Sequence, residues 1–126
     1  MPRALSEGCY NGMFDHIREC DQIHVVSDAA EPVDLANELV MGLMDSVDDY
    51  EVVAGTPNGW RLNVLGQPGL PIAVSDTARH IVLTADDGLG GREIRLVTPC
   101  TNRLITAGDF ANVSQFYLQV DDPVEP

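Results

Sequence analysis

The chain has 126 residues, of which 44% are hydrophobic, which is enough for one domain with its own core and too apolar for a disordered chain. Twenty acidic residues oppose seven basic ones, and the formal net charge is −13. No apolar run approaches the roughly 20 residues of a membrane helix. The negative charge disfavours binding to a phosphate backbone or an anionic membrane. We therefore expect neither a nucleic-acid nor a membrane partner.

Every basic residue is Arg, so chemistry that needs Lys, such as a Schiff base or a P-loop, is excluded. Cys9, Cys20 and Cys100 make an odd count, which argues against a disulfide framework and fits reduced thiols. The first residues lack the apolar core of a signal peptide. We expect the protein to fold in the cytoplasm of the cell that makes it and to carry no cofactor.

The first 20 residues predict a short helix, followed by a strand. Met13, Phe14 and Ile17 fall at near-helical spacing, with Asn11 as the expected N-cap. Residues 22–27 are rich in β-branched side chains in an alternating pattern, so they predict the first strand.

Three leucines spaced four apart in residues 34–44 favour a second short helix with Asp34 as its N-cap. The alternative is a long acidic loop between strands. Residues 50–54 and 60–66 then predict strands, whereas the Pro and Gly of residues 67–71 predict a turn.

The second half of the chain alternates apolar and polar side chains, as strands with one buried and one wet face do. In the second of these segments, Ile94 and Leu96 are expected to face the core, opposite Glu93 and Arg95. The glycine-rich residues 86–91 predict a hairpin turn. The predicted strands are residues 80–86, 92–98, 103–107 and 113–121, with 72–74 as a brief edge strand.

Seven or eight short strands separated by turns are typical of a mainly β protein. We expect an antiparallel β-sandwich, immunoglobulin-like or jelly-roll-like, with one or two short helices near the N-terminus. It would form a single domain over residues 1–126, with a short N-terminal arm (1–12) and an acidic C-terminal tail (122–126).

The N-terminal quarter holds a candidate metal site. His16, Cys20 and His24 are spaced four apart, and on one continuous helix they would share a face with zinc-ligand chemistry, with Cys9 nearby. Since His24 lies in a strand-like run and no C-x₂-C knuckle is present, a buried cysteine and two ordinary histidines are the expected outcome.

Other sets of reactive residues are better explained by local structure. Ser75, Asp76 and His80 lack the G-x-S-x-G turn that a nucleophile requires, so a polar strand entry is expected there. The paired acidic residues lack calcium-loop spacing and are expected to be solvated. Phe14 and Trp60 are expected in the core, whereas Tyr10 and Tyr117 are candidates for a protein interface.

Several segments together resemble a group of small virion proteins of tailed bacteriophages. The resemblance is a pattern of strands and turns from about Asp15 onward and includes no catalytic signature; the acidic residues 34–49 have no counterpart in it. The segments are DHI (15–17), QIHVVSDAAEP (22–32), GTPNGWRLNV (55–64), TARHIVLTADDG (77–88) and RLITAGDFANVSQFYLQVDDP (103–123).

The resemblance implies a structural role without catalysis, most plausibly as a capsid decoration or cement protein on the outer shell. Its partners would be the major capsid protein or other virion proteins, with self-association as a dimer or trimer. A tail, baseplate or host-binding module is the alternative, and a small metal-dependent hydrolase is a third hypothesis. The expected interface residues are Arg3, Leu5, Tyr10, Tyr117 and Pro123.

Overall fold

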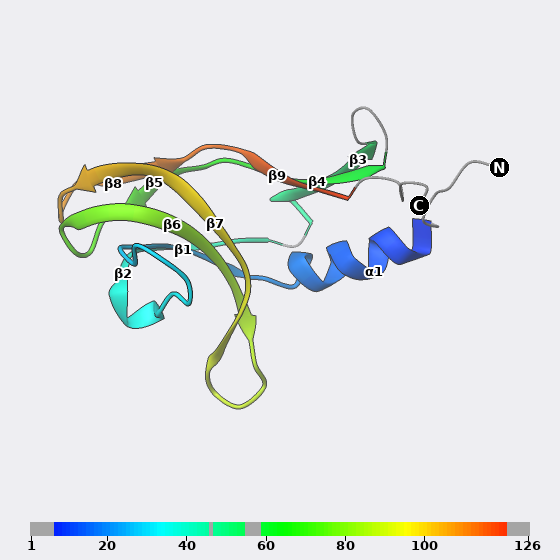
Figure 1. Ribbon diagram of the computed structural model, residues 1–126, viewed down its shortest axis with the longest axis horizontal. Helices are drawn as coiled ribbons and strands as arrows, with labels where there is room; N and C mark the ends of the chain where they lie inside the picture. Colours follow the sequence, from blue (N-terminus) through cyan, green and yellow to red (C-terminus); the bar gives the residue numbers. More distant parts are fainter. Residues whose placement is uncertain (1–6, 46, 55–58, 121–126) are drawn as a thin grey trace.

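The computed structural model describes residues 7–45, 47–54 and 59–120, and in these residues the protein is mainly β with antiparallel sheets (Figure 1). The sheets have the strand orders β2-β1-β6-β7, β3-β4-β9 and β5-β8. No helix in this part is long and apolar enough to cross a membrane. The elements are α1 (Glu7–Arg18), β1 (Gln22–Val26), the 3-10 helix η1 (Leu35–Asn37), β2 (Glu38–Leu43), β3 (Tyr50–Ala54), β4 (Trp60–Val64), β5 (Gln67–Pro71), β6 (Asp76–Asp86), β7 (Arg92–Ile105), β8 (Phe110–Val113) and β9 (Phe116–Val120).

The two smaller sheets share one long antiparallel ribbon, in which β4 and β5 run opposite β8 and β9. Val64 pairs with Phe116, and Gln67 pairs with Val113, so the same number of residues separates the two pairs on each side. The register therefore continues across the break between the sheets. A Cβ at Gly66, inside the break, would lie 3.1 Å from the carbonyl oxygen of Val113, so the two backbones approach closely there.

The ribbon is also joined to the four-stranded sheet. Val40 of β2 forms an isolated antiparallel bridge with Ile72, which directly follows β5. The amide of Ala73 donates to the carbonyl of Leu39 at 2.9 Å. Neighbouring strands can therefore be followed in the series β7-β6-β1-β2-β5-β8.

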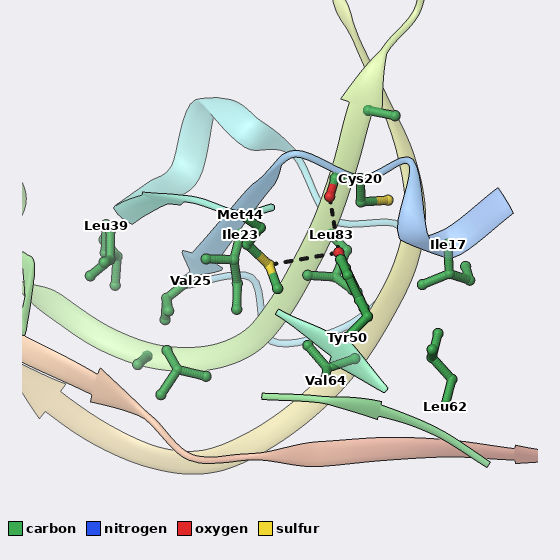
Figure 2. Packing of buried hydrophobic residues seen from close by; sticks show 14 of the residues in the cluster. Ile17, Cys20, Ile23, Val25, Leu39, Met44, Tyr50, Leu62, Val64 and Leu83 are labelled. Carbon is green, nitrogen blue, oxygen red and sulfur yellow. Dashed lines mark hydrogen bonds between the residues drawn. The ribbon is translucent and has the colours of Figure 1, made fainter. Parts of the chain in front are cut away.

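The core lies where the four-stranded sheet, the ribbon and α1 meet (Figure 2). Phe14 and Ile17 of α1 are buried, as the helical spacing predicts, whereas Met13 is exposed. The Tyr50 hydroxyl donates to the Cys20 carbonyl at 2.9 Å, which ties β3 to the junction between α1 and β1. Asn11 lies within α1, so its prediction as N-cap is wrong.

The prediction that one face of the sheet is wet is wrong at Val82 and Thr84, both of which are buried. His24 of β1, which pairs with Val82, is buried as well. The segment between β1 and β2 folds back over this face. His80 Nδ1 of β6 lies 2.7 Å from the carbonyl oxygen of Asp28, which belongs to this segment. Val33 of the same segment and Val97 of β7 line a shallow recess.

The predicted helix over residues 34–44 is wrong beyond one 3-10 turn. Asp34 does cap this turn, because its carboxylate accepts from the Ala36 amide at 2.9 Å. The remaining residues form β2 along β1, and a register shift between Val25 and Val26 lets the adjacent Leu39 and Val40 both be buried. Long-range pairing therefore overrides the leucine spacing.

Three further boundaries differ from prediction. Residues 67–71 form strand β5 and not a turn, and the two strands predicted within 92–107 are one strand, β7. Residues 72–74 form no strand and contribute the Ile72 bridge and the bond of the Ala73 amide to Leu39. Strand β9 lies within the last predicted strand, residues 113–121, whereas β8 overlaps that strand only at Val113, so the sequence pattern does not predict β8.

A bulge explains why Ile94 is 38% exposed instead of facing the core. Leu83 pairs with Leu96 and the next residue, Thr84, pairs with Ile94, so Arg95 is the extra residue of β7. One extra residue in a strand makes the side chains that precede it point to the opposite face of the sheet.

We predict that Gly42→Val destabilises the fold. A Cβ at Gly42 would lie 2.7 Å from Leu70 Cδ2 and 3.1 Å from Ile23 Cγ2, so the Leu70 side chain would have to shift and the contact of β2 with β5 would be disturbed. We expect a loss of roughly 1–3 kcal/mol in the free energy of unfolding, measured by urea denaturation. Met41→Val, at the neighbouring and exposed position, is the control and should cost less than about 0.5 kcal/mol. Equal losses would contradict the close contact of β2 with β5.

Candidate functional site

A cleft of about 540 Å³ lies between β7 and β8. One side is lined by residues 98–101 of β7, and the other by residues 109–116. The register of β6 with β7 shifts between Ala78 and His80, which gives β7 two extra residues here, so successive residues of β7 border the cleft. The floor is apolar and comes from Val25, Ile72, Ala78 and Ile81.

Both edges are free in the described residues. β7 pairs only with β6, and β8 pairs only with β5, so the strand series begins and ends at this cleft. Alternate N–H and C=O groups of an unpaired edge have no partner in a sheet and are a template for another strand.

The turn between β7 and β8 explains why they do not pair. Its Gly108 has φ of 93° and donates to the Ile72 carbonyl, and the Ile72 amide donates to the Asp109 carbonyl, both at 3.0 Å. These reciprocal bonds direct β8 along β5. A short connection that would otherwise close a hairpin therefore separates the two strands.

Two large apolar side chains project to solvent beside the cleft. Leu104 is 74% exposed and Phe110 is 71% exposed, and both line the cleft. Arg103 and Asp109 supply one charge of each sign. Cys100 also lines the cleft, and partial burial raises the pKa of its thiol.

The structure does not bring the candidate zinc ligands together. Cys20 is fully buried, the exposed His16 lies 4.0 Å from the Glu93 carboxylate, and both ring nitrogens of His24 have other partners. The Cys9 side chain lies outside the described residues. In the part of the chain with described side chains, no three His, Cys, Asp or Glu residues gather in a metal-binding group.

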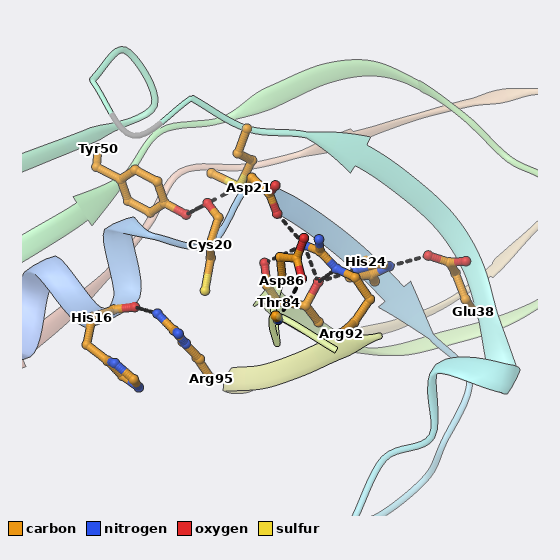
Figure 3. Close-up of polar contacts among 12 residues, drawn as sticks. His16, Cys20, Asp21, His24, Glu38, Tyr50, Thr84, Asp86, Arg92 and Arg95 are labelled. Atoms are coloured by element: carbon orange, nitrogen blue, oxygen red, sulfur yellow. Dashed lines mark hydrogen bonds and ion pairs between the residues drawn. The ribbon is translucent and has the colours of Figure 1, made fainter. Parts of the chain in front are cut away.

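His24 instead belongs to a partly buried polar network that sequence reasoning missed (Figure 3). Its Nδ1 bonds to Glu38, and its Nε2 lies 2.7 Å from the Thr84 hydroxyl. The Arg92 guanidinium donates to the same hydroxyl at 3.1 and 3.2 Å and pairs with Asp21, which holds the pKa of Asp21 below its ordinary value. The network joins β2, β1, β6 and β7, and no local sequence spacing signals it.

An acid, an imidazole and a hydroxyl in line are also the parts that activate a nucleophile. Here the Thr84 side chain is fully buried and its oxygen already accepts from Arg92, so no substrate reaches it in this arrangement. The network therefore stabilises the sheet by joining its neighbouring strands.

Ser75, Asp76 and His80 each bond separately to the backbone. The Ser75 hydroxyl oxygen accepts from the Ala107 amide, and the Asp76 carboxylate accepts from the Thr77 amide, both at 2.7 Å. His80 bonds to the segment that follows β1. The predicted polar strand entry is confirmed.

The glycine-rich residues 86–91 form the predicted hairpin turn. Gly88 and Gly90 have positive φ, and the Asp87 carboxylate accepts from the amides of Leu89 and Gly91. These two bonds lower the pKa of Asp87.

Only part of the predicted interface can be located. Tyr117 is 55% exposed, and the Arg61 guanidinium carbon lies 3.8 Å from its ring centroid. Arg3, Leu5 and Pro123 lie outside the described residues. Tyr10 lies in α1, and its side chain is outside the described part.

Comparisons of the chain with protein-family models, curated proteins and solved structures find no match. We therefore infer function from the cleft, its strand edges and its exposed side chains.

We predict that Thr84→Val weakens the fold although it preserves the shape of the side chain. It removes the oxygen shared by His24 and Arg92 and leaves buried polar groups unpaired. We expect a loss of about 1–3 kcal/mol in unfolding free energy. Thr101→Val, at an exposed position of β7, should change it by less than about 0.5 kcal/mol. A similar small effect at both positions would show that the network contributes little.

Alkaline pH should destabilise the protein through Cys20. Burial raises the pKa of its thiol from 9.0 to about 11. A raised folded-state pKa contributes stability below the unfolded value, and this stability is lost as the pH rises through about 11. The unfolding free energy measured by urea denaturation should therefore fall between pH 9 and 11, by at most about 1.4 kcal/mol for each pH unit from this group.

Cys20→Ala removes this titration and should show a shallower decline over the same pH range. Tyr50→Phe separates the contribution of Tyr50, whose pKa burial also raises. Identical slopes for Cys20→Ala and the unmodified protein would contradict the assignment to Cys20.

Proposed function

We propose that the protein is a structural subunit that binds other proteins through the cleft between β7 and β8. The observation that carries this proposal is the exposure of Leu104 and Phe110 beside two free strand edges. Large apolar side chains gathered at one exposed place are typical of protein-binding surfaces.

The resemblance to tailed-bacteriophage virion proteins extends this proposal to a particular setting. We propose a capsid decoration or cement protein on the outer shell, bound to the major capsid protein or another virion protein, in dimers or trimers. The net charge of −13 supports an outer position, since such a surface is repelled by packaged DNA.

We also propose a specific architecture for the described sheets. The four-stranded sheet and the long ribbon contribute core residues from two sides, which supports an antiparallel β-sandwich of the immunoglobulin-like or jelly-roll-like kind. Such a body has a fixed surface for assembly.

Many copies acting together would stabilise a shell even if each contact were weak. A specific contact of standard size buries roughly 1,200–2,000 Å² in total. Several contacts on one particle raise the overall strength of binding without any new contact.

We predict that the purified protein co-sediments with undecorated capsids, and that a Leu104→Ser/Phe110→Ser double variant binds about tenfold more weakly or worse. Both side chains are exposed, so folding should be preserved. Leu89→Ser is the control, since Leu89 is 91% exposed at the distant hairpin turn.

No co-sedimentation of the unmodified protein would contradict the decoration role. Labelling of intact virions supplies the second readout. Label over the head supports decoration, whereas label confined to the tail would replace it with the tail or baseplate alternative.

A further inference from the structure

We infer that the cleft takes an extended segment of a partner protein as an added strand between β7 and β8, with basic residues flanking its apolar positions. This inference rests on the proposed function, because it specifies how a protein partner docks at the same cleft. It goes further by naming the conformation and the chemistry of the docked segment.

The first step is the hydrogen-bonding capacity of the two edges. Among the described residues, β7 and β8 each have one partner strand and one unpaired side, and residues of both strands border the cleft. An extended segment has donors and acceptors on both sides, so one strand serves both edges at once. Binding of this kind draws affinity from main-chain bonds.

The second step is the fit of side chains. Val25, Ile72, Ala78 and Ile81 form an apolar floor, so side chains that point inward from an added strand meet an apolar surface. Side chains at the intervening positions point outward, where Leu104 and Phe110 stand beside polar groups. A segment of about five or six residues with alternating apolar side chains matches an ordinary strand.

The third step is charge. The chain carries a net charge of −13, so in this cleft a basic segment is favoured over a segment from a second acidic copy. Charge complementarity mainly sets the association rate and the choice of partner. The occupant is therefore a segment of a different, basic protein.

An added strand would also close the series of paired strands. The series β7-β6-β1-β2-β5-β8 has two free ends at one cleft, and one added strand would join them. Pairing would remove both exposed edges, which in free form are sites of nonspecific association.

The test uses the full chain and the synthetic peptide KKTVTITVKK, with amide hydrogen exchange read by NMR. We expect saturable binding and new protection at those amides of residues 98–105 and of β8 that do not bond to β6 or β5, because only the amides that face the cleft gain a partner. The peptide EETVTITVEE, with the same strand but opposite flanking charge, should bind about tenfold more weakly at low salt.

Matched variants test whether the peptide binds at the cleft. Leu104→Ser/Phe110→Ser should weaken binding of the basic peptide by about tenfold, whereas Leu89→Ser should leave it unchanged. Protection of neither edge at millimolar peptide, or protection elsewhere only, would overturn the inference. Concentration-dependent self-association with the same protected amides would overturn it in favour of a second copy.

The capsid experiment and the peptide experiment test different claims, so either one can fail without the other. Peptide binding without capsid binding would sustain the added strand and reject the decoration role. Capsid binding without edge protection by peptide, and without edge protection by the capsid, would sustain decoration and reject the added strand.

Discussion

The unpaired backbone edges of β7 and β8 are the constraint on which the functional account depends. Strand pairs and one bridge connect β7, β6, β1, β2, β5 and β8 in series, and only the two ends of that series are left without partners in the described residues. The reciprocal bonds between Ile72 and the turn at Gly108 and Asp109 keep those ends apart. An open position in the sheet is therefore part of the fold itself.

The rest of the structure holds the two sides of the cleft in place. The buried bonds from His24 to Glu38 and Thr84 cross three strands, and Arg92 extends them to β7. On the other side of the cleft, the register of β4 with β9 continues into the pairing of Gln67 with Val113, which aligns β8 with β5. A binding edge needs such support, because ordering it only at the moment of binding would cost conformational entropy.

Local patterns in the sequence predict much of the fold but not the cleft. Alternation places β1, β3 and β4, and the glycines near Leu89 signal the hairpin. The leucines of β2 suit a helix equally well, and only pairing with β1 decides between them. The bulge at Arg95 and the β5 strand within a Pro- and Gly-rich segment depend on neighbouring strands. The cleft arises between segments that do not pair, a relation that no local pattern encodes.

Amide hydrogen exchange of the free protein tests the central claim most directly. If β7 and β8 have free edges, the amides of residues 98–105 and of β8 that do not bond to β6 or β5 exchange rapidly, while those of β1, which is paired on both sides, exchange slowly. Slow exchange at every amide of both edge segments in the monomer would show that the edges are already paired and would contradict the account.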